Sequence, residues 1–74
     1  MKIREVTEMF TALDILDRPA RIPKGAVLVD FRVGPGHEGH PPENPNIASF
    51  YYEGVVYYAS ISEIKGKTKL AWSR

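Results

Sequence analysis

The side chains best suited to chemistry lie in one stretch of the sequence, Arg32 to Asn46, which reads RVGPGHEGHPPENPN. Its imidazoles and carboxylates are of the kinds that bind zinc and similar ions, at His37, Glu38, His40 and Glu43. The metalloprotease motif HExxH needs two histidines four positions apart on a helix, but His37 and His40 are three apart, and the neighbouring glycines and prolines oppose a helix. We therefore expect no bound metal or other cofactor, and His37 and His40 are only weak metal candidates.

The same glycine-rich and proline-rich composition predicts a long loop over residues 34–46. Such a loop is longer than most connections in small domains, and long loops often carry function. Charged and imidazole side chains there would be available to a protein partner. The sequence thus nominates four residues in or beside the loop for partner binding: Arg32, His37, Glu38 and His40.

Catalytic motifs are missing from the rest of the chain. There is no cysteine nucleophile, and no serine lies in the Gly-x-Ser-x-Gly setting of a hydrolase. The segment GPGHEG has the glycines of a phosphate-binding loop but not its lysine or the start of a helix. We predict that the protein is not an enzyme.

Length and composition indicate a single small globular domain spanning residues 1–74. Hydrophobic residues make up 43% and charged residues 26% of the 74 positions, a balance typical of folded domains with little room for an enclosed active site. The absence of cysteine favours an intracellular protein. The opening MKIREVTEMF lacks the apolar run of a signal peptide, and no segment is apolar for long enough to span a bilayer. We expect a cytoplasmic protein without membrane contact.

Apolar residues between positions 5 and 17 fit two secondary structures. A helix is indicated by the spacing of Val6, Met9, Phe10, Leu13 and Leu16, and Pro19 would end it. A strand over TALDIL would instead place Leu13 and Ile15 on one face. The periodicity slightly favours the helix. The next apolar segment, AVLVDFRV at residues 26–33, is rich in β-branched residues and predicts a strand.

Residues 47–61, IASFYYEGVVYYASI, predict a β-hairpin that turns at Glu53 and Gly54. Side-chain alternation predicts that one face is core, with Phe50, Tyr52, Val55, Tyr57, Ala59 and Ile61. The other face is predicted to meet solvent, with Ser49, Tyr51, Val56, Tyr58, Ser60 and Ser62. Tyr51 and Tyr58 are then diagonal neighbours that form an aromatic platform.

The C-terminal segment predicts a helical turn around Ser62 to Ile64, a turn at Lys65 and Gly66, and a last strand through Leu70 and Trp72. Strict alternation places Leu70 and Trp72 on an apolar side and Lys67 and Lys69 on the opposite side. Trp72 could be a core residue or an exposed anchor, and the pattern favours the core. Charge is uneven along the chain. Residues 1–64 have six basic and nine acidic side chains, whereas the last ten residues have four basic and none acidic. A basic terminus favours nucleic acid or an acidic partner.

The segments TALDILDRPARIPKGAVLVDF and FYYEGVVYYASISEI resemble the SH3-like small β-barrels, in particular the bacterial type. The similarity covers about half of the chain and is carried by Thr11 to Ile15, Pro23 to Gly25, Gly54, Tyr57 and Ile64. The resemblance implies a mainly β fold, with about five short antiparallel strands in a barrel used for binding. The loop at 34–46 and the missing second G-W-V element depart from the family pattern. The alternative is an α+β fold with one N-terminal helix packed on a four-stranded antiparallel sheet.

These features predict a small protein-interaction module that acts as an accessory subunit, regulator or inhibitor by binding a larger protein. Small domains of this class are frequent among phage and mobile-element accessory proteins, a class-level expectation that no single residue demonstrates, and the source organism is left open. The predicted partner-binding residues are Arg32, His37, Glu38, His40, Tyr51 and Tyr58. The alternative is a single-stranded nucleic-acid-binding protein that uses Tyr51, Tyr58, Lys65, Lys67 and Lys69. The oligomeric state is left open.

Overall fold

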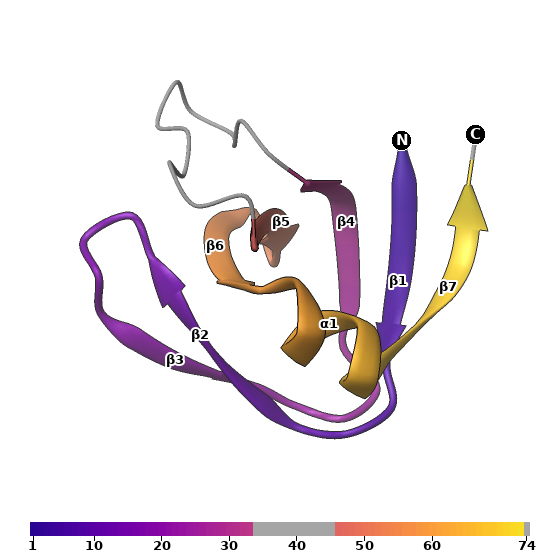
Figure 1. Ribbon diagram of the computed structural model, residues 1–74, viewed down its shortest axis with the longest axis horizontal. Coiled ribbons are helices and arrows are strands. Elements are labelled where there is room, and N and C mark those ends of the chain that lie inside the picture. Colours follow the sequence, from indigo (N-terminus) through magenta and orange to yellow (C-terminus); the bar gives the residue numbers. More distant parts are fainter. Residues whose placement is uncertain (34–45, 74) are drawn as a thin grey trace.

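The computed structural model describes residues 1–33 and 46–73, which form one antiparallel sheet of seven strands in the order β3-β2-β6-β5-β4-β1-β7. The elements in chain order are β1 (Lys2–Val6), β2 (Phe10–Asp14), β3 (Pro19–Ile22), β4 (Val27–Val33), β5 (Ile47–Tyr52), β6 (Val55–Ser60), α1 (Ile61–Lys67) and β7 (Thr68–Ser73). The sheet curls into a half-barrel whose open side holds α1 (Figure 1). The predicted mainly β class is confirmed, but the described residues contain seven strands rather than about five.

The predicted N-terminal helix is wrong, because residues 2–22 form three strands. In β2, Phe10 and Ala12 are buried while Leu13 is 42% exposed, which is the alternation of a strand. The apparent helical period arose from two short strands on either side of a turn, which happen to place buried Val6 and Phe10 four positions apart. The α+β alternative that depended on this helix is therefore contradicted.

The core lies on the inner, concave face of the sheet. It contains the buried side chains Val6, Phe10, Ala12, Ile22, Ala26, Leu28, Phe31, Ala48, Phe50, Ala59 and Ile64. The Phe50 ring lies 6.1 Å from the Phe10 ring, edge to face, and stacks on Tyr57 at 6.0 Å. Ile64 of α1 is fully buried, so the helix closes the open side of the half-barrel over these rings.

The β5–β6 hairpin has the predicted register, with Tyr51 opposite Val56 and Ser49 opposite Tyr58. Its inner face is confirmed at Phe50, but Val55 is 46% exposed because it follows the turn at the end of the sheet. Ser49 and Val56, predicted to meet solvent, are buried instead. Ser49 is small and sits between longer neighbours in the register, so an outward direction does not by itself expose it.

The hairpin turn provides a sharp test of backbone conformation. Glu53 and Gly54 have φ angles of 50° and 78°, the pair of positive values that a two-residue type I′ turn requires. Gly54→Ala should lower the free energy of unfolding by about 1 kcal/mol, although a Cβ there meets no atom, because the left-handed conformation disfavours alanine. Gly66→Ala in α1 is the matched control. It should raise stability by roughly 0.5–1 kcal/mol in urea denaturation, and equal effects of the two changes would contradict this geometry.

The segment after the hairpin forms more helix than the sequence predicted. Ser60 caps α1 through its Oγ, which accepts a hydrogen bond from the backbone N–H of Glu63 at 3.1 Å. The Glu63 carboxylate also pairs with Lys67 Nζ at 3.1 Å, one turn later. These contacts carry the helix through Lys65 and Gly66, where a turn was expected, and Lys67 belongs to α1 rather than to the last strand.

A bulge in β7 changes the side on which Trp72 lies. Trp72 pairs with Ile3 and Leu70 with Arg4, so the register shifts by one residue at Ala71. Trp72 therefore points to the outer face, while Leu70 points to the inner face. The expectation that both share an apolar side, with Trp72 in the core, is wrong, and Trp72 is 45% exposed.

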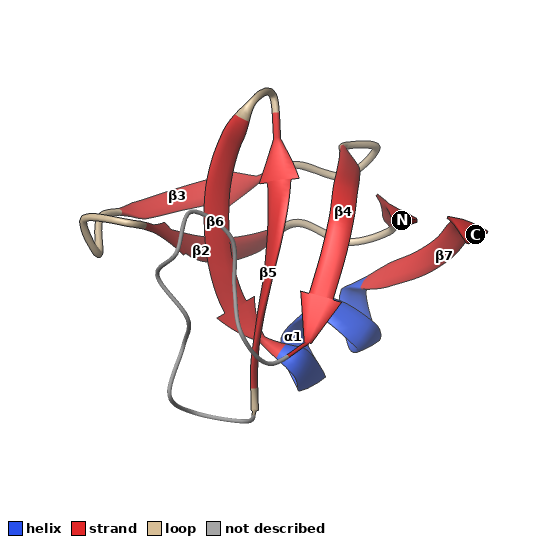
Figure 2. Ribbon diagram, turned by 90° about the horizontal axis from the view of Figure 1, so that it is seen from above, coloured by secondary structure: helices blue, strands red, loops and turns tan. Residues whose placement is uncertain are grey.

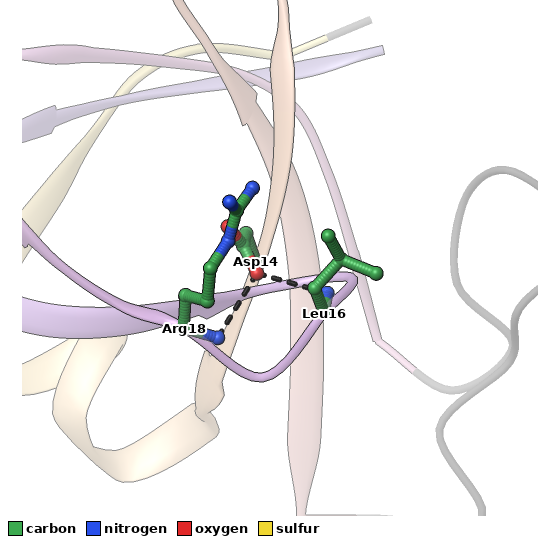
Figure 3. Close-up of polar contacts among 3 residues, drawn as sticks. All are labelled: Asp14, Leu16 and Arg18. Carbon is green, nitrogen blue, oxygen red and sulfur yellow. Dashed lines mark hydrogen bonds and ion pairs between the residues drawn. The ribbon is translucent and has the colours of Figure 1, made fainter.

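The β2–β3 turn is held by Asp14 (Figure 3). Asp14 Oδ1 accepts hydrogen bonds from the backbone N–H groups of Leu16 at 2.8 Å and Arg18 at 3.0 Å, and Oδ2 accepts from Arg18 Nε at 2.9 Å. The hydrogen bond from the Arg18 backbone is the largest of the effects that lower the pKa of Asp14, and the Leu16 backbone and the Arg18 side chain add to it. The carboxylate thus stabilises the turn in its ionised form.

Asp14→Asn should lower the melting temperature by a few degrees at neutral pH, because the neutral amide cannot accept all three hydrogen bonds that the carboxylate anion accepts. Because folding lowers the pKa of Asp14, its contribution is complete above about pH 4 and disappears as pH falls further. The gap in melting temperature between the native protein and D14N should therefore close in acid. Asp17→Asn, which removes a carboxylate from the same turn but leaves the three hydrogen bonds of Asp14 in place, is the matched control.

Candidate functional site

The outer, convex face of the sheet carries a continuous row of side chains from five strands. Cross-strand pairing places Trp72 opposite Ile3, Ile3 opposite Val29, and Val29 opposite Tyr51, which pairs with Val56. We call these five residues the outer row. Trp72 and Val29 are 45% and 36% exposed, and Val56 is buried. Figure 2 shows β4, β5 and β6, which carry three of the five residues, lying side by side.

A second row runs beside the first on the same face. Its members, in register, are Arg32, Ser49, Tyr58, Leu13 and Pro19. Tyr51 and Tyr58 are therefore diagonal neighbours, as the sequence predicted, and Arg32 lies beside Tyr51. Three of the predicted partner-binding residues, from β4, β5 and β6, meet on one surface.

The apolar character of this face is unusual for a sheet whose core lies on the other side. Antiparallel sheets with one solvated face normally alternate apolar and polar side chains. Here the outer face carries exposed apolar groups on both rows, and it continues into a shallow hollow lined by Ile15, Gly54, Val55 and Val56. Ser49 and Val56 are buried within the two rows, so the exposed apolar side chains of Leu13, Val29 and Trp72 are distributed across the face, and a face with several such side chains is a candidate interaction site.

Arg32 is fixed on the outer face by a second bulge. Asp30 has a φ of 54°, and the register of β4 against β5 shifts between Val29 and Arg32. Asp30 Oδ2 accepts a hydrogen bond from Arg32 Nη2 at 2.8 Å, and this bond is the main cause that raises the pKa of Arg32. The Arg32 side chain is 54% exposed, so it is held in place yet presented to a partner.

The structure does not bring the predicted lysines together with the two tyrosines. Lys65 and Lys67 lie on α1, on the inner side of the sheet, and Lys67 pairs with Glu63. Lys69 is on the outer face, but its Nζ is 3.2 Å from Glu5 Oε1. It is also three strands from Tyr51, or roughly 14 Å.

Three predicted partner-binding residues, His37, Glu38 and His40, lie outside the described residues, as does Glu43. Across residues 1–33 and 46–73, no group of three or more histidine, cysteine, aspartate or glutamate side chains is arranged to hold a metal ion. Within the same residues, no helix has the length and apolar character needed to cross a bilayer.

Sequence reasoning missed the apolar residues that link the tyrosines into a larger surface: Ile3, Leu13, Val29 and Trp72. Alternation along each strand could have placed Leu13 outward under the strand interpretation. It could not have joined Ile3 to Trp72, because these residues come from opposite ends of the chain and meet only through the pairing of β1 with β7.

Comparisons with known proteins find no matching family model, no matching curated protein and no matching solved structure. The curled antiparallel sheet is compatible with a small barrel. The more specific resemblance to SH3-like barrels stays a prediction. The outer face is therefore the feature on which a function is proposed.

Proposed function

We propose that this protein is a small protein-interaction module that binds a larger protein through the outer face of its sheet. The main support for this proposal is the pair of rows that presents aromatic, aliphatic and arginine side chains on the face opposite the core. In this role it acts as an accessory subunit, regulator or inhibitor on a half-barrel related to the SH3-like small barrels.

The composition of the face supports a protein partner. Tyrosine, tryptophan and arginine contribute most of the binding energy at protein interfaces, and Tyr51, Trp72 and Arg32 lie on this face. Tyrosine side chains have few rotatable bonds, so little conformational entropy is lost when a partner covers them. The Asp30 contact reduces the entropy lost by Arg32 in the same way.

Single-stranded nucleic acid is the competing occupant. Such binding needs cations beside the stacking aromatics, because phosphates follow the bases at short intervals. Lys67 and Lys69 are each paired with a glutamate and lie away from the tyrosines. Because these two lysines do not lie beside Tyr51 and Tyr58, the described residues favour a protein partner over a nucleic acid.

The test is affinity capture from a lysate of the source cells with the tagged protein, with and without nuclease, followed by mass spectrometry and a nucleic-acid gel. We expect one stoichiometric protein that survives nuclease treatment and is lost with Val29→Glu, which puts a charge at the centre of the outer row. Arg21→Glu, on the exposed edge strand β3, is the control and should capture normally.

Three outcomes would contradict the proposal. Retained nucleic acid, with proteins lost on digestion, would favour the competing occupant. Equal capture by V29E and the native protein would show that the outer face is not the site. Absence of any stoichiometric protein would remove the interaction-module function. Melting curves of V29E and R21E must first show that both variants fold.

A further inference from the structure

The two edges of the sheet differ in how open they are to another strand. The β3 edge has only four residues and begins with Pro19, which has no backbone N–H to donate. The β7 edge has six residues, and among the described residues no strand pairs with its far side. Its Leu70 and Trp72 are 52% and 45% exposed on opposite faces, so a strand added here would find apolar surface on both sides.

The charge around this edge is concentrated and positive. The sector made of β1, α1 and β7 has five basic and two acidic side chains, whereas the other described residues have four basic and five acidic. Both acidic groups, Glu5 and Glu63, are already paired with lysines. The remaining cations have no carboxylate partner among the described residues: Lys2, Arg4 and Lys65.

Arg4 is the most constrained of these cations. Its Nε donates to Thr68 Oγ1 at 2.7 Å, and its guanidinium lies 5.5 Å from the centre of the Phe31 ring. Thr68 is the first residue of β7, and Arg4 pairs with Leu70 in the ladder. A fixed positive charge therefore lies beside the first residue of β7, one strand in from the open edge.

We propose that the β7 edge binds an extended acidic segment of a partner protein by adding it to the sheet as a further strand. Backbone hydrogen bonds to β7 would supply the pairing, apolar side chains on the outer face of the added strand would cover Trp72, and carboxylates on its inner face would neutralise Lys2, Arg4 and Lys65. A second copy of this chain is a poorer occupant, because pairing two β7 edges would bring two positive sectors together. The proposal goes beyond the outer-face function, since the edge needs neither Arg32 nor Tyr58.

The probe is a soluble, capped eight-residue peptide of alternating glutamate and valine, with binding followed by fluorescence anisotropy and backbone amide shifts. Two matched peptides separate charge from pairing: one has lysine in place of glutamate, and one is N-methylated at every second residue. We expect the acidic peptide to bind with shifts in β7 and β1, and both matched peptides to bind at least about tenfold more weakly. Added salt should weaken binding of the acidic peptide, because it screens the attraction between opposite charges.

Lys2→Glu and Arg21→Glu make the same change in net charge at opposite edges. Lys2 is exposed beside β7 and Arg21 is exposed on β3. K2E should therefore weaken binding of the acidic peptide several-fold, while R21E should leave its binding unchanged. Tyr58→Ala should leave peptide binding unchanged, which separates this test from that of the outer face.

Each opposite result overturns the strand-addition proposal. If the acidic peptide does not bind, the proposal fails. Equal binding of the N-methylated peptide would contradict backbone pairing, and equal binding of the lysine peptide would contradict the role of charge. Tighter binding of an oligothymidylate with shifts in β7 would assign the edge to nucleic acid. A dimer of the protein alone, with β7 amides protected from exchange, would assign it to a second copy.

Discussion

Phe50→Ala is expected to unfold a large fraction of the protein at physiological temperature. Phe50 is fully buried at the centre of the core, where its ring contacts the rings of Phe10 and Tyr57. Removing a buried phenylalanine costs about 3–5 kcal/mol, because transfer free energy is lost and a cavity remains. Small domains have total stabilities of roughly 5–15 kcal/mol, and a 74-residue chain lies at the low end.

Urea denaturation followed by circular dichroism measures this effect. Val55→Ala is the matched control in the same hairpin, because Val55 is 46% exposed and its truncation should cost less than about 0.5 kcal/mol. If F50A and V55A had similar midpoints, the core would not be organised around Phe50. Loss of cooperative unfolding in F50A alone is the expected result.

Tyr51→Ala is expected to cause the largest loss of partner affinity of any single change on the outer face. Tyr51 belongs to the outer row and lies diagonally beside Tyr58 and Arg32, at the centre of the described surface. Truncating a central tyrosine at a protein interface costs about 2 kcal/mol, or about 30-fold in Kd. Binding of the captured partner, measured by calorimetry, should weaken by this amount and depend little on salt.

Arg21→Ala provides the control for this change, because Arg21 is exposed on the edge strand β3 and belongs to neither row. It should leave the Kd unchanged. A steep salt dependence of binding, or equal affinity of Y51A and the native protein, would show that charge or another surface dominates. The melting temperature of Y51A should stay within a few degrees of the native value, since Tyr51 points away from the core.

The central hairpin followed from the sequence because its determinants are local. Glu53 and Gly54 place the turn, and the two-residue connection then fixes every cross-strand pair of β5 and β6 without reference to the rest of the chain. The diagonal placement of Tyr51 and Tyr58 was predictable for the same reason. The strand at residues 27–33 was also evident, since its β-branched residues have a local preference for extended backbone.

The N-terminal strands and the outer row were decided only by tertiary structure. Residues 5–17 have a local period that fits a helix, but pairing of β1 with β4 and of β2 with β6 outweighs it. Ile3, Val29 and Trp72 become neighbours through ladders that join distant segments, and the bulge at Ala71 turns Trp72 outward. Alternation along one strand cannot reveal such a surface, because the position of each side chain depends on the register set by its neighbours.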